Sequence, residues 1–452
     1  MKRTHVISWI CCLSAISALT YAEEQAADIV VEKPAEQTQQ LSVEAANADA
    51  QVVLTVHDQV QAIFDEFIQK RSIRAYGARD ERGICYYADS DIVSCGPENP
   101  EFIPKRATAF TRAYNKAVMQ HIKYMTGVMA STTVDKLVDN SSSDVLDTPQ
   151  ELADAMTGIT KKLAVLSEAK IDEELVKLGI DPNKYKGKPL EVKRTTYLSE
   201  LVKTSATRAI GSSAGLAVVK TFEARTPDNT YAIGVILKFD PAFAEIASCM
   251  SKKIRPVVAP KPGLPVDALI GKDPAILLQN FGTRLFYDEK GEPALLSFGQ
   301  WASTFSGNDP RRKARKQDVA LLQAEELANQ ALNEYITGSV SYENASETGE
   351  VLEEANIFDE NGTFREGNVN KLLSKLQTKF RNVASDTLAG RKIVYKKILK
   401  HPAGHEVAVV AVSWSFSQLD AVRNTPPPPP AAAKPVTVPG DAGVREGDEY
   451  DF

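Results

Sequence analysis

The chain has few of the residues that build metal and redox sites. Its 452 residues include 5 cysteines and 5 histidines, and no Walker loop, dinucleotide-binding fingerprint, paired-cysteine zinc motif or HExxH run occurs. These absences weigh against common hydrolase and redox chemistry. A carboxylate site assembled from distant segments stays open, because such a site leaves no local motif. The sequence therefore predicts no catalytic residue, no cofactor and no metal.

Long apolar runs and long basic runs are also missing beyond the N-terminus. No segment after residue 22 has the roughly 20 uninterrupted apolar residues of a membrane-spanning helix. Without Lys2 and Arg3, 51 basic residues face 59 acidic ones, a net charge of −8. No basic block is long enough to follow a phosphate backbone. The sequence thus predicts no transmembrane span and no nucleic-acid partner.

The N-terminus has the features of a secretory signal. An apolar run over residues 6–19 follows Lys2 and Arg3, and small residues stand at both positions that a signal peptidase reads before a cut after Ala22. The two cysteines within the run lack the small preceding residues of a lipoprotein signal. We expect a cleaved signal peptide over 1–22, no lipid anchor, and a periplasmic or extracellular location.

Two pairs of segments repeat within the chain. Residues 76–127 match 287–338 without a gap at a shift of 211 positions, and residues 198–239 match 373–414 at a shift of 175. Two copies of one folding unit are therefore expected. The first pair shares alanines at four-residue spacing, which are Ala109, Ala113 and Ala117 in one segment and Ala320, Ala324 and Ala328 in the other.

Each copy is predicted to fold as a two-layer α+β unit of order β-β-α-(variable)-α-β-β. A hairpin opens the copy, with strands at Arg74–Tyr76 and Ile84–Tyr87 in the first. A long helix follows, and its alanine stripe lets it lie close against the sheet. The closing strands are apolar at nearly every position, which places them in the middle of a sheet covered on both sides. An additional helical segment of the first copy has an apolar stripe of Leu152, Met156, Ile159, Leu163 and Leu166.

These patterns divide the chain into segments. A flexible leader (23–40) and an amphipathic helix (41–71) follow the signal peptide. The first copy (72–250) contains the helical insertion (145–190), and a proline-rich linker (251–275) joins it to the second copy (276–417). A disordered, proline-rich and acidic tail (418–452) follows.

Cys85 and Cys95 form a candidate disulfide, because an oxidising compartment could close their spacing into a small loop. The corresponding residues of the second copy are Leu296 and Ser306, so that copy folds without a bridge. The unbridged state is therefore favoured, and the bridged one stays open. Cys249 is left over in the bridged state.

Three local patterns resemble functional motifs and have simpler explanations. His401 and His405 lie in the hairpin turn of the second copy without a supporting ligand set, which favours a solvated turn over a metal site. The segment 359–362 ends in Asn-Gly but lacks two of the strongest ligands of a calcium loop, which indicates a plain turn. Residues 211–215 resemble a nucleophile elbow but lead from a helix into a strand, so a helix-ending glycine explains them.

The alanine-striped helix, followed by Ala214-Gly-Leu-Ala-Val-Val219 and Tyr231-Ala-Ile-Gly-Val235, resembles a family of small surface lipoproteins and flagellar outer-ring accessory proteins of Gram-negative bacteria. The similarity covers the core of each copy. It implies an α+β unit, no catalysis and assembly around larger envelope machinery. The chain departs from the family in lacking a lipidated cysteine, which puts anchoring in the outer membrane in doubt, and in its proline-rich tail. A family of secreted two-domain proteins is the alternative.

These patterns together predict an exported, non-enzymatic cell-envelope protein that acts as an assembly or protein-binding module. Its partner would be an envelope protein or a further copy of itself, and a peripheral position at the outer membrane stays open. The alternative is an extracytoplasmic enzyme or small-ligand receptor with its site in the groove between the two copies. A structural appendage subunit is a third hypothesis.

Overall fold

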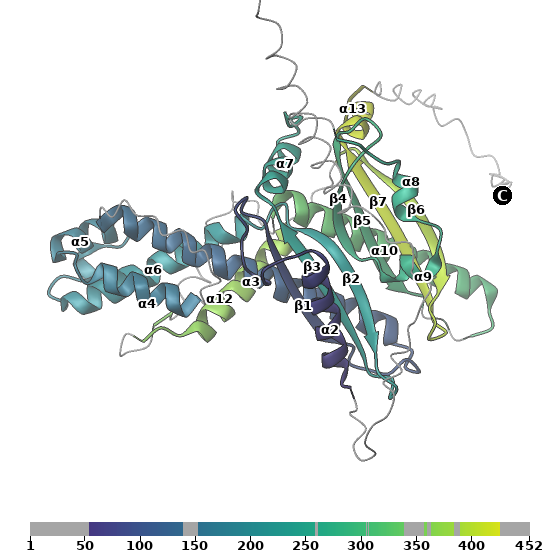
Figure 1. Cartoon of the computed structure of the whole chain (residues 1–452), viewed down its shortest axis with the longest axis horizontal. Coiled ribbons are helices and arrows are strands. Elements are labelled where there is room, and N and C mark those ends of the chain that lie inside the picture. Colours follow the sequence, from purple (N-terminus) through teal and green to yellow (C-terminus); the bar gives the residue numbers. More distant parts are fainter. Residues whose placement is uncertain are drawn as a thin grey trace, which may run out of the picture.

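The structure is a computed structural model that describes residues 54–138, 152–257, 261–303, 305, 307–338, 357–358, 363–383 and 389–424. These residues form two antiparallel sheets covered by helices, and a group of helices that extends to one side of the sheets (Figure 1). The α+β prediction is confirmed. The predicted signal peptide and leader, and the segment 359–362, lie outside the described residues.

The first copy has a three-stranded sheet in the order β1-β3-β2, and its helices pack on both faces. The long helix α3 lies on one face and the N-terminal helix α2 on the other. The partner surface that the amphipathic pattern of α2 requires is thus the outer face of this sheet. The bounds are Val56–Lys70 for α2, Cys85–Ile92 for β1, Phe102–Val138 for α3, Ala217–Arg225 for β2 and Tyr231–Phe239 for β3.

The second copy has a four-stranded sheet in the order β4-β5-β7-β6. Helix α10 packs on one face, the short helices α8 and α9 pack on the other, and α13 follows β7. The bounds are Val266–Ile270 for α8, Pro274–Gln279 for α9, Gly282–Tyr287 for β4, Pro293–Ala302 for β5, Pro310–Thr337 for α10, Arg391–Lys400 for β6, Glu406–Ser415 for β7 and Phe416–Asn424 for α13.

The two sheets repeat one another in detail. The alanine stripes of α3 and α10 are buried against β1 and β5, and the central strands β3 and β7 are buried along almost their whole length, as predicted. Each copy has a β-bulge at the same place, Val219 in β2 and Val394 in β6, which are 175 positions apart. Gly215 and Gly390, also 175 positions apart, have φ angles of +83° and +89°. Each lies against the backbone of the helix that ends its copy, where a Cβ atom would clash.

The hairpin predicted to open the first copy is reduced to a single antiparallel bridge between Arg79 and Cys85. The predicted strand at Arg74–Tyr76 has no strand structure, and only β1 follows it. Ser72 and Gly77 adopt positive φ angles of 52° and 80°, and the Tyr76 hydroxyl donates a hydrogen bond of 3.0 Å to the Phe64 carbonyl of α2. The Tyr76 side chain is therefore held against α2, while the Gly77 N–H donates a hydrogen bond of 2.8 Å to the Tyr86 carbonyl of β1. In the second copy β4 occupies the corresponding edge of the sheet.

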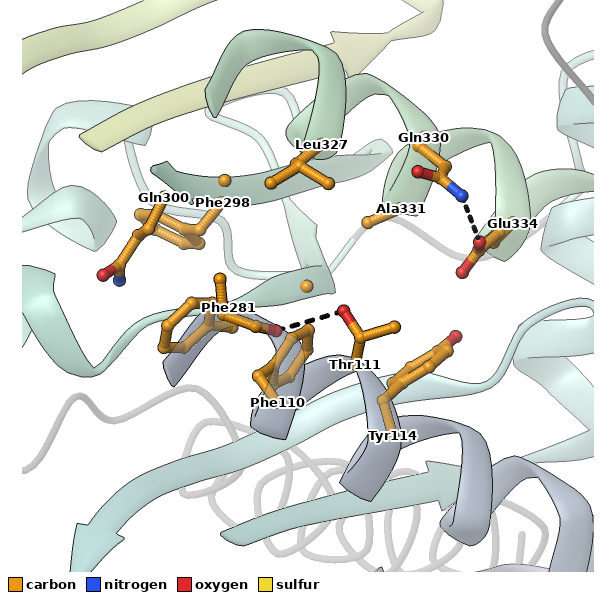
Figure 2. Close-up of a pocket in the computed structure, with 13 residues that line it drawn as sticks. Phe110, Thr111, Tyr114, Phe281, Phe298, Gln300, Leu327, Gln330, Ala331 and Glu334 are labelled. Atoms are coloured by element: carbon orange, nitrogen blue, oxygen red, sulfur yellow. Dashed lines mark hydrogen bonds between the residues drawn. The ribbon is translucent and has the colours of Figure 1, made fainter. Parts of the chain in front are cut away.

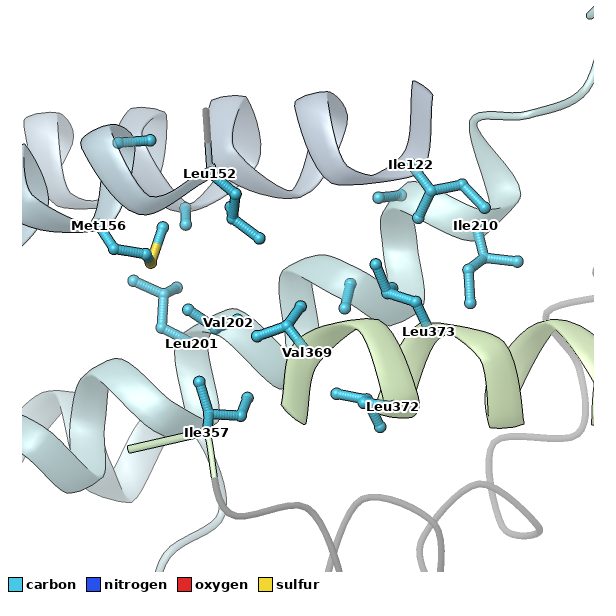
Figure 3. Packing of buried hydrophobic residues seen from close by; sticks show 14 of the residues in the cluster. Ile122, Leu152, Met156, Leu201, Val202, Ile210, Ile357, Val369, Leu372 and Leu373 are labelled. Carbon is cyan, nitrogen blue, oxygen red and sulfur yellow. The ribbon is translucent and has the colours of Figure 1, made fainter. Parts of the chain in front are cut away.

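The two copies exchange helices. Helix α12 (Glu366–Val383) of the second copy packs on α3 and α6 (Leu190–Gly211) of the first, and Figure 3 shows its side chains in the first-copy core. Helix α7 (Pro241–Ser251) of the first copy packs in return on α10. The exchanged side chains are Val369, Leu372 and Leu373 from α12 and Ile246, Ala247 and Met250 from α7. The copies therefore form one packed unit.

The helical insertion forms α4 (Leu152–Leu163), α5 (Glu168–Lys177) and the single 3-10 turn η1 (Pro182–Lys184). All five residues of the predicted apolar stripe are buried, which confirms that prediction. We name α4, α5, η1, α6 and residues 127–138 of α3 the arm. The arm extends from the sheets to the left of Figure 1.

The predicted start of the tail, at residue 418, is too early. Residues 418–424 belong to α13, which packs against β6 and β7 and buries Leu419. This helix is the counterpart of α7, whose place in the repeat the sequence did not reveal. Residues from 425 onward lie outside the described residues. Within the described ranges no helix combines the length and apolarity needed to cross a bilayer.

Candidate functional site

A cavity of about 120 Å³ lies in the groove between the two copies. One wall is α3 of the first copy, and the other walls are β4, β5 and α10 of the second (Figure 2). Since an engineered apolar cavity of about 150 Å³ binds benzene, this one has room for a single aromatic ring or a branched aliphatic group. The cavity lies where the sequence placed an alternative ligand site.

Aromatic rings line the apolar side of the cavity. Phe110 and Phe281 are stacked with their centroids 4.7 Å apart, and Phe298 and Leu327 lie beside them (Figure 2). The polar side has fewer groups, among them Glu334, which accepts a hydrogen bond of 3.2 Å from the Gln330 amide. The cavity thus combines an apolar body with a carboxylate and an amide at one edge.

A cluster of polar side chains from both copies is buried next to the cavity. Arg106 of α3 is 1% exposed, and its guanidinium lies 4.9 Å from the centroid of the Phe281 ring. It donates hydrogen bonds to the Glu223 carboxylate of β2, to Gln300 Oε1 of β5 at 2.9 Å, and to the Leu278 carbonyl. Gln300 itself lines the cavity. We name Arg106, Glu223, Gln300 and His401 the inter-copy cluster.

The Glu223 carboxylate is held ionised in this cluster. Burial alone would raise its pKa, but the Arg106 charge and hydrogen bonds from His401 and Arg106 outweigh burial and lower the pKa to about 2. A buried ion pair of this kind depends on both partners, because removing one leaves an uncompensated charge in the interior. The ion pair itself lies within the first copy, and hydrogen bonds of Arg106 to Gln300 and Leu278 and of His401 to Glu223 connect it to the second copy.

The hairpin turn between β6 and β7 completes the cluster, so the prediction of a solvated turn is wrong. His401 is 5% exposed, and its Nε2 lies 3.4 Å from Glu223 Oε1. Its Nδ1 accepts a hydrogen bond of 3.1 Å from the Ala403 N–H, which assigns the ring proton to Nε2. His405 Nε2 lies 2.6 Å from the Pro97 carbonyl oxygen. The first copy packs over this turn. The sequence prediction treated each copy alone and therefore did not include this contact.

A second buried polar group lies in the core of the first copy. The ring of His121 is fully buried, with Nδ1 3.2 Å from the Tyr87 hydroxyl and Nε2 3.1 Å from the Ser212 carbonyl oxygen. Burial lowers the pKa of His121 to about 3, against a smaller opposing effect of the Ser212 hydrogen bond. The corresponding residues of the second copy are the apolar Leu332 and Phe298. This group is thus neither shared by the copies nor open to a substrate.

The candidate disulfide between Cys85 and Cys95 is not formed. Cys85 is the first of the eight residues of β1 and Cys95 follows the end of this strand, so the length of the strand separates them. That strand spans more than about 20 Å, whereas a disulfide requires Cα atoms within about 7 Å. Cys85, Cys95 and Cys249 are all free thiols. Burial raises the pKa of the Cys85 thiol, which leaves it protonated at neutral pH.

The other sequence patterns have plain outcomes. Residues 211–215 follow the end of α6 at Gly211, as the helix-end interpretation predicts. Within the described part of the chain, no group of three or more histidine, cysteine, aspartate or glutamate side chains is arranged to hold a metal ion.

The far end of the arm presents an exposed surface. The Arg194 guanidinium of α6 donates hydrogen bonds of 2.7 and 2.9 Å to the carbonyls of Ala164 and Leu166, which brings the start of α6 against the loop between α4 and α5. Exposed lysines lie along the adjoining segment, and two valines in this region are 71% and 43% exposed. We name this surface the tip. It contains Val165, Lys184, Lys186, Lys188 and Val192.

Sequence reasoning missed the inter-copy cluster, although one signal was present. Arg106 stands three residues before Ala109, on the same buried side of α3, and a charged residue in an apolar stripe indicates a buried partner. Gln300 gives a similar signal within the apolar strand β5. Glu223 and His401 have no local signal, because their partners are distant in the sequence.

Three comparisons with known proteins place the chain only broadly. A family model described as a domain of unknown function (DUF6844) matches residues 156–252, from within α4 to the residue after α7. The crystal structure of the hypothetical protein FTT1539c from Francisella tularensis is similar over 82% of this chain and 94% of that one, at 18% sequence identity and a TM-score of 0.51. At this identity the similarity shows the fold alone. No curated protein matches the chain.

Proposed function

We propose that the protein is an exported, non-enzymatic cell-envelope protein that binds a partner protein through the tip of its arm. The observation that carries the proposal is that the arm covers neither sheet. The faces of the two sheets are packed against α2 and α3 in the first copy and against α8, α9 and α10 in the second. The helices α4 and α5 instead pack with α3 and α6, in a core that continues into the inner face of the first sheet.

The arm is also held in a fixed direction by both copies. Its core contains Val369 and Leu373 of α12, so the second copy packs directly on its base (Figure 3). Ion pairs add to this packing, with Lys123 Nζ 3.2 Å from Glu366 and Lys162 Nζ 2.6 Å from Asp135. A rigid projection lowers the entropy cost of binding, because its surface is already ordered.

The chemistry of the tip favours an acidic protein surface as the partner. Lys184, Lys186 and Lys188 are exposed and have no acidic partner among the described residues. Val165 and Val192 add exposed apolar area beside them. Charged residues raise the rate of association with a surface of opposite sign, and apolar area at the centre of a contact supplies affinity.

Reversing the three lysines to glutamate (K184E, K186E, K188E) is expected to lower partner crosslinking at least tenfold. A photo-crosslinking amino acid at position 190, beside the tip, would capture the partner in intact cells, and mass spectrometry would identify it. The matched control replaces Arg311, Arg315 and Lys316 with glutamate. These substitutions change the net charge by the same amount but lie on a distant helix. Absence of any crosslinked protein, or an equal loss with both variants, would contradict the proposal.

Export has a separate test that does not depend on the partner. Mass spectrometry of the protein from the periplasmic or secreted fraction is expected to show an N-terminus at Glu23, the first residue after the predicted cut after Ala22. A full-length chain confined to the cytoplasm would contradict export and leave the binding test intact.

A small-ligand receptor is the second candidate, and the cavity between the copies favours it. The stacked Phe110 and Phe281 rings and the carboxylate of Glu334 suit a small molecule that has an aromatic or branched apolar group and a hydrogen-bond donor.

A variant that fills the cavity tests this candidate, with phenol as the probe because it has one aromatic ring and a hydrogen-bond donor. We expect phenol to change the NMR signals of the Phe110 region, and Ala331→Phe to weaken that binding at least tenfold by occupying the space. Ala314→Phe is the matched control, because Ala314 is exposed on the same helix. Equal phenol binding by both variants would show that the cavity is not the site.

A further inference from the structure

The second copy has a strongly basic surface, formed by the first turns of α10 and the edge strand β6. The rest of the chain has the opposite balance, because the net charge of the whole chain is −6. We name this surface the basic face. It contains Arg311, Arg312, Lys313, Arg315 and Lys316 from α10 and, from the residues of β6 on the α10 side of the sheet, Arg391, Lys396 and Lys400.

Only part of this charge is neutralised within the fold. Three of the cations form ion pairs, Arg312 with Asp309, Lys313 with Glu406 and Lys396 with Glu325, at 3.5, 2.6 and 3.0 Å. Others have no acidic partner among the described residues, and these include Arg311, Arg315, Lys316 and Lys400. The basic face therefore keeps an excess of positive charge for an anionic ligand.

Two large apolar side chains adjoin the unpaired cations. Val319 and Leu322 are 53% and 60% exposed, and they follow Arg315 by four and seven positions. Residues at this spacing lie on one side of a helix. A ligand of this surface should therefore offer negative charges together with apolar or aromatic groups.

We propose that the basic face binds residues 441–452 of the same chain. This segment has five acidic residues and one arginine, and it includes two aromatic residues, Tyr450 and Phe452. The acidic groups match the unpaired cations, and the aromatic rings match Val319 and Leu322. The acidic residues are Asp441, Glu446, Asp448, Glu449 and Asp451.

The connecting chain is long enough for this contact. The structure describes the chain up to Asn424 of α13, and α13 lies beside the first residues of β6, where Leu419 approaches Gly390. The first turns of α10 lie at the opposite end of β6, where Lys313 pairs with Glu406. The ten residues of β6 span about 33 Å. Sixteen residues, the length of the segment 425–440, are able to span about 50 Å at the rise of about 3.1 Å per residue of an extended proline-rich chain.

Attachment to the same chain favours this occupant over a free anion. A tethered segment has an effective concentration in the millimolar range when its connection spans the site. A proline-rich connection also loses less conformational entropy on binding than a flexible one.

The test places benzoylphenylalanine at position 450 of the full chain and maps the crosslinks by mass spectrometry. We expect crosslinks at monomer mass to peptides of the basic face, reduced at least fivefold by R311E, R315E and K316E together. The arm variant with K184E, K186E and K188E is the matched control and should keep them. Salt at 0.5 M should also reduce them, because it screens exposed charges within a few ångströms.

Three outcomes would overturn the proposal. Crosslinks that map elsewhere, or that survive the α10 charge reversal, would show that this segment does not occupy the basic face. Crosslinks between two chains would assign the occupant to a second copy. Phosphatidylglycerol vesicles could also bind wild type and the variant with D448K, E449K and D451K equally well. That result would show that the segment does not cover the basic face and that an anionic membrane does. Stronger vesicle binding by that variant would support the proposal.

Discussion

Replacing Arg106 with methionine is expected to lower the free energy of unfolding by about 3–5 kcal/mol, measured by urea denaturation at pH 7. The substitution keeps an apolar chain of similar length but leaves the Glu223 carboxylate in the interior without its cation. The low pKa of Glu223 depends on Arg106, so the carboxylate must then bind a proton or pull water into the interface. Either change weakens the contact between the copies.

Two variants separate this effect from a general loss of packing. Arg112→Met is the matched control on the same helix, because Arg112 is 61% exposed and pairs with Asp91 at the surface; its cost should stay below about 1 kcal/mol. The double variant Arg106→Met with Glu223→Leu should recover most of the lost stability, because it removes the buried charge together with its partner. A single variant as stable as wild type would show that the cluster contributes nothing to the interface.

Acid sensitivity between pH 6.5 and 4.5 is the second large expected effect. The pKa of His121 is about 3 in the folded chain and near 6.5 in the unfolded chain, so the unfolded state binds a proton first as the pH falls. The contribution of His121 to folded stability is fully present above pH 6.5 and declines below it at about 1.4 kcal/mol per pH unit, which amounts to about 3 kcal/mol at pH 4.5. Glu223 also has a lowered pKa, but its contribution declines mainly below its unfolded value of 4.5.

The second copy supplies the variant that tests this effect. Combining His121→Leu with Tyr87→Phe introduces the residues of the second copy, Leu332 and Phe298, and leaves no unpaired hydroxyl. Unfolding free energies of this double variant should change little between pH 6.5 and 4.5. His57→Gln, a change of an exposed histidine on α2, should retain the wild-type slope. An unchanged slope in the double variant would assign the acid sensitivity to other groups.

Features that depend on local periodicity could be predicted from the sequence. The alanine stripes of α3 and α10, the apolar central strands and the stripe of α4 each follow from the spacing of residues that are close in the chain. The two shifts of 211 and 175 also predicted which residues correspond, and the bulges at Val219 and Val394 follow that correspondence. The left-handed conformation of Ser72 could not be predicted from local periodicity, and neither could the absence of a regular strand at Arg74–Tyr76.

The exchange of helices could not be predicted, because an amphipathic pattern does not show which surface a helix packs against. The apolar side of α12 requires a surface to cover, but nothing in its spacing distinguishes its own sheet from α3 and α6. The same limit applies to the candidate site. Arg106 signals that a buried acid exists, whereas Glu223 lies 117 positions away, and the turn of His401 lies in the other copy. Such pairs become visible only when the fold brings them together.

Hydrogen exchange measured across a urea titration tests most directly whether the two copies are one cooperative unit that holds the arm. We expect β3 (Tyr231–Phe239) and β7 (Glu406–Ser415) to lose protection at the same urea concentration, together with the arm helix α6. Arg106→Met should lower all three midpoints equally. If one strand kept its protection after the other had lost it, the copies would be independent domains, and the inter-copy cluster would not join them into a single cooperative unit.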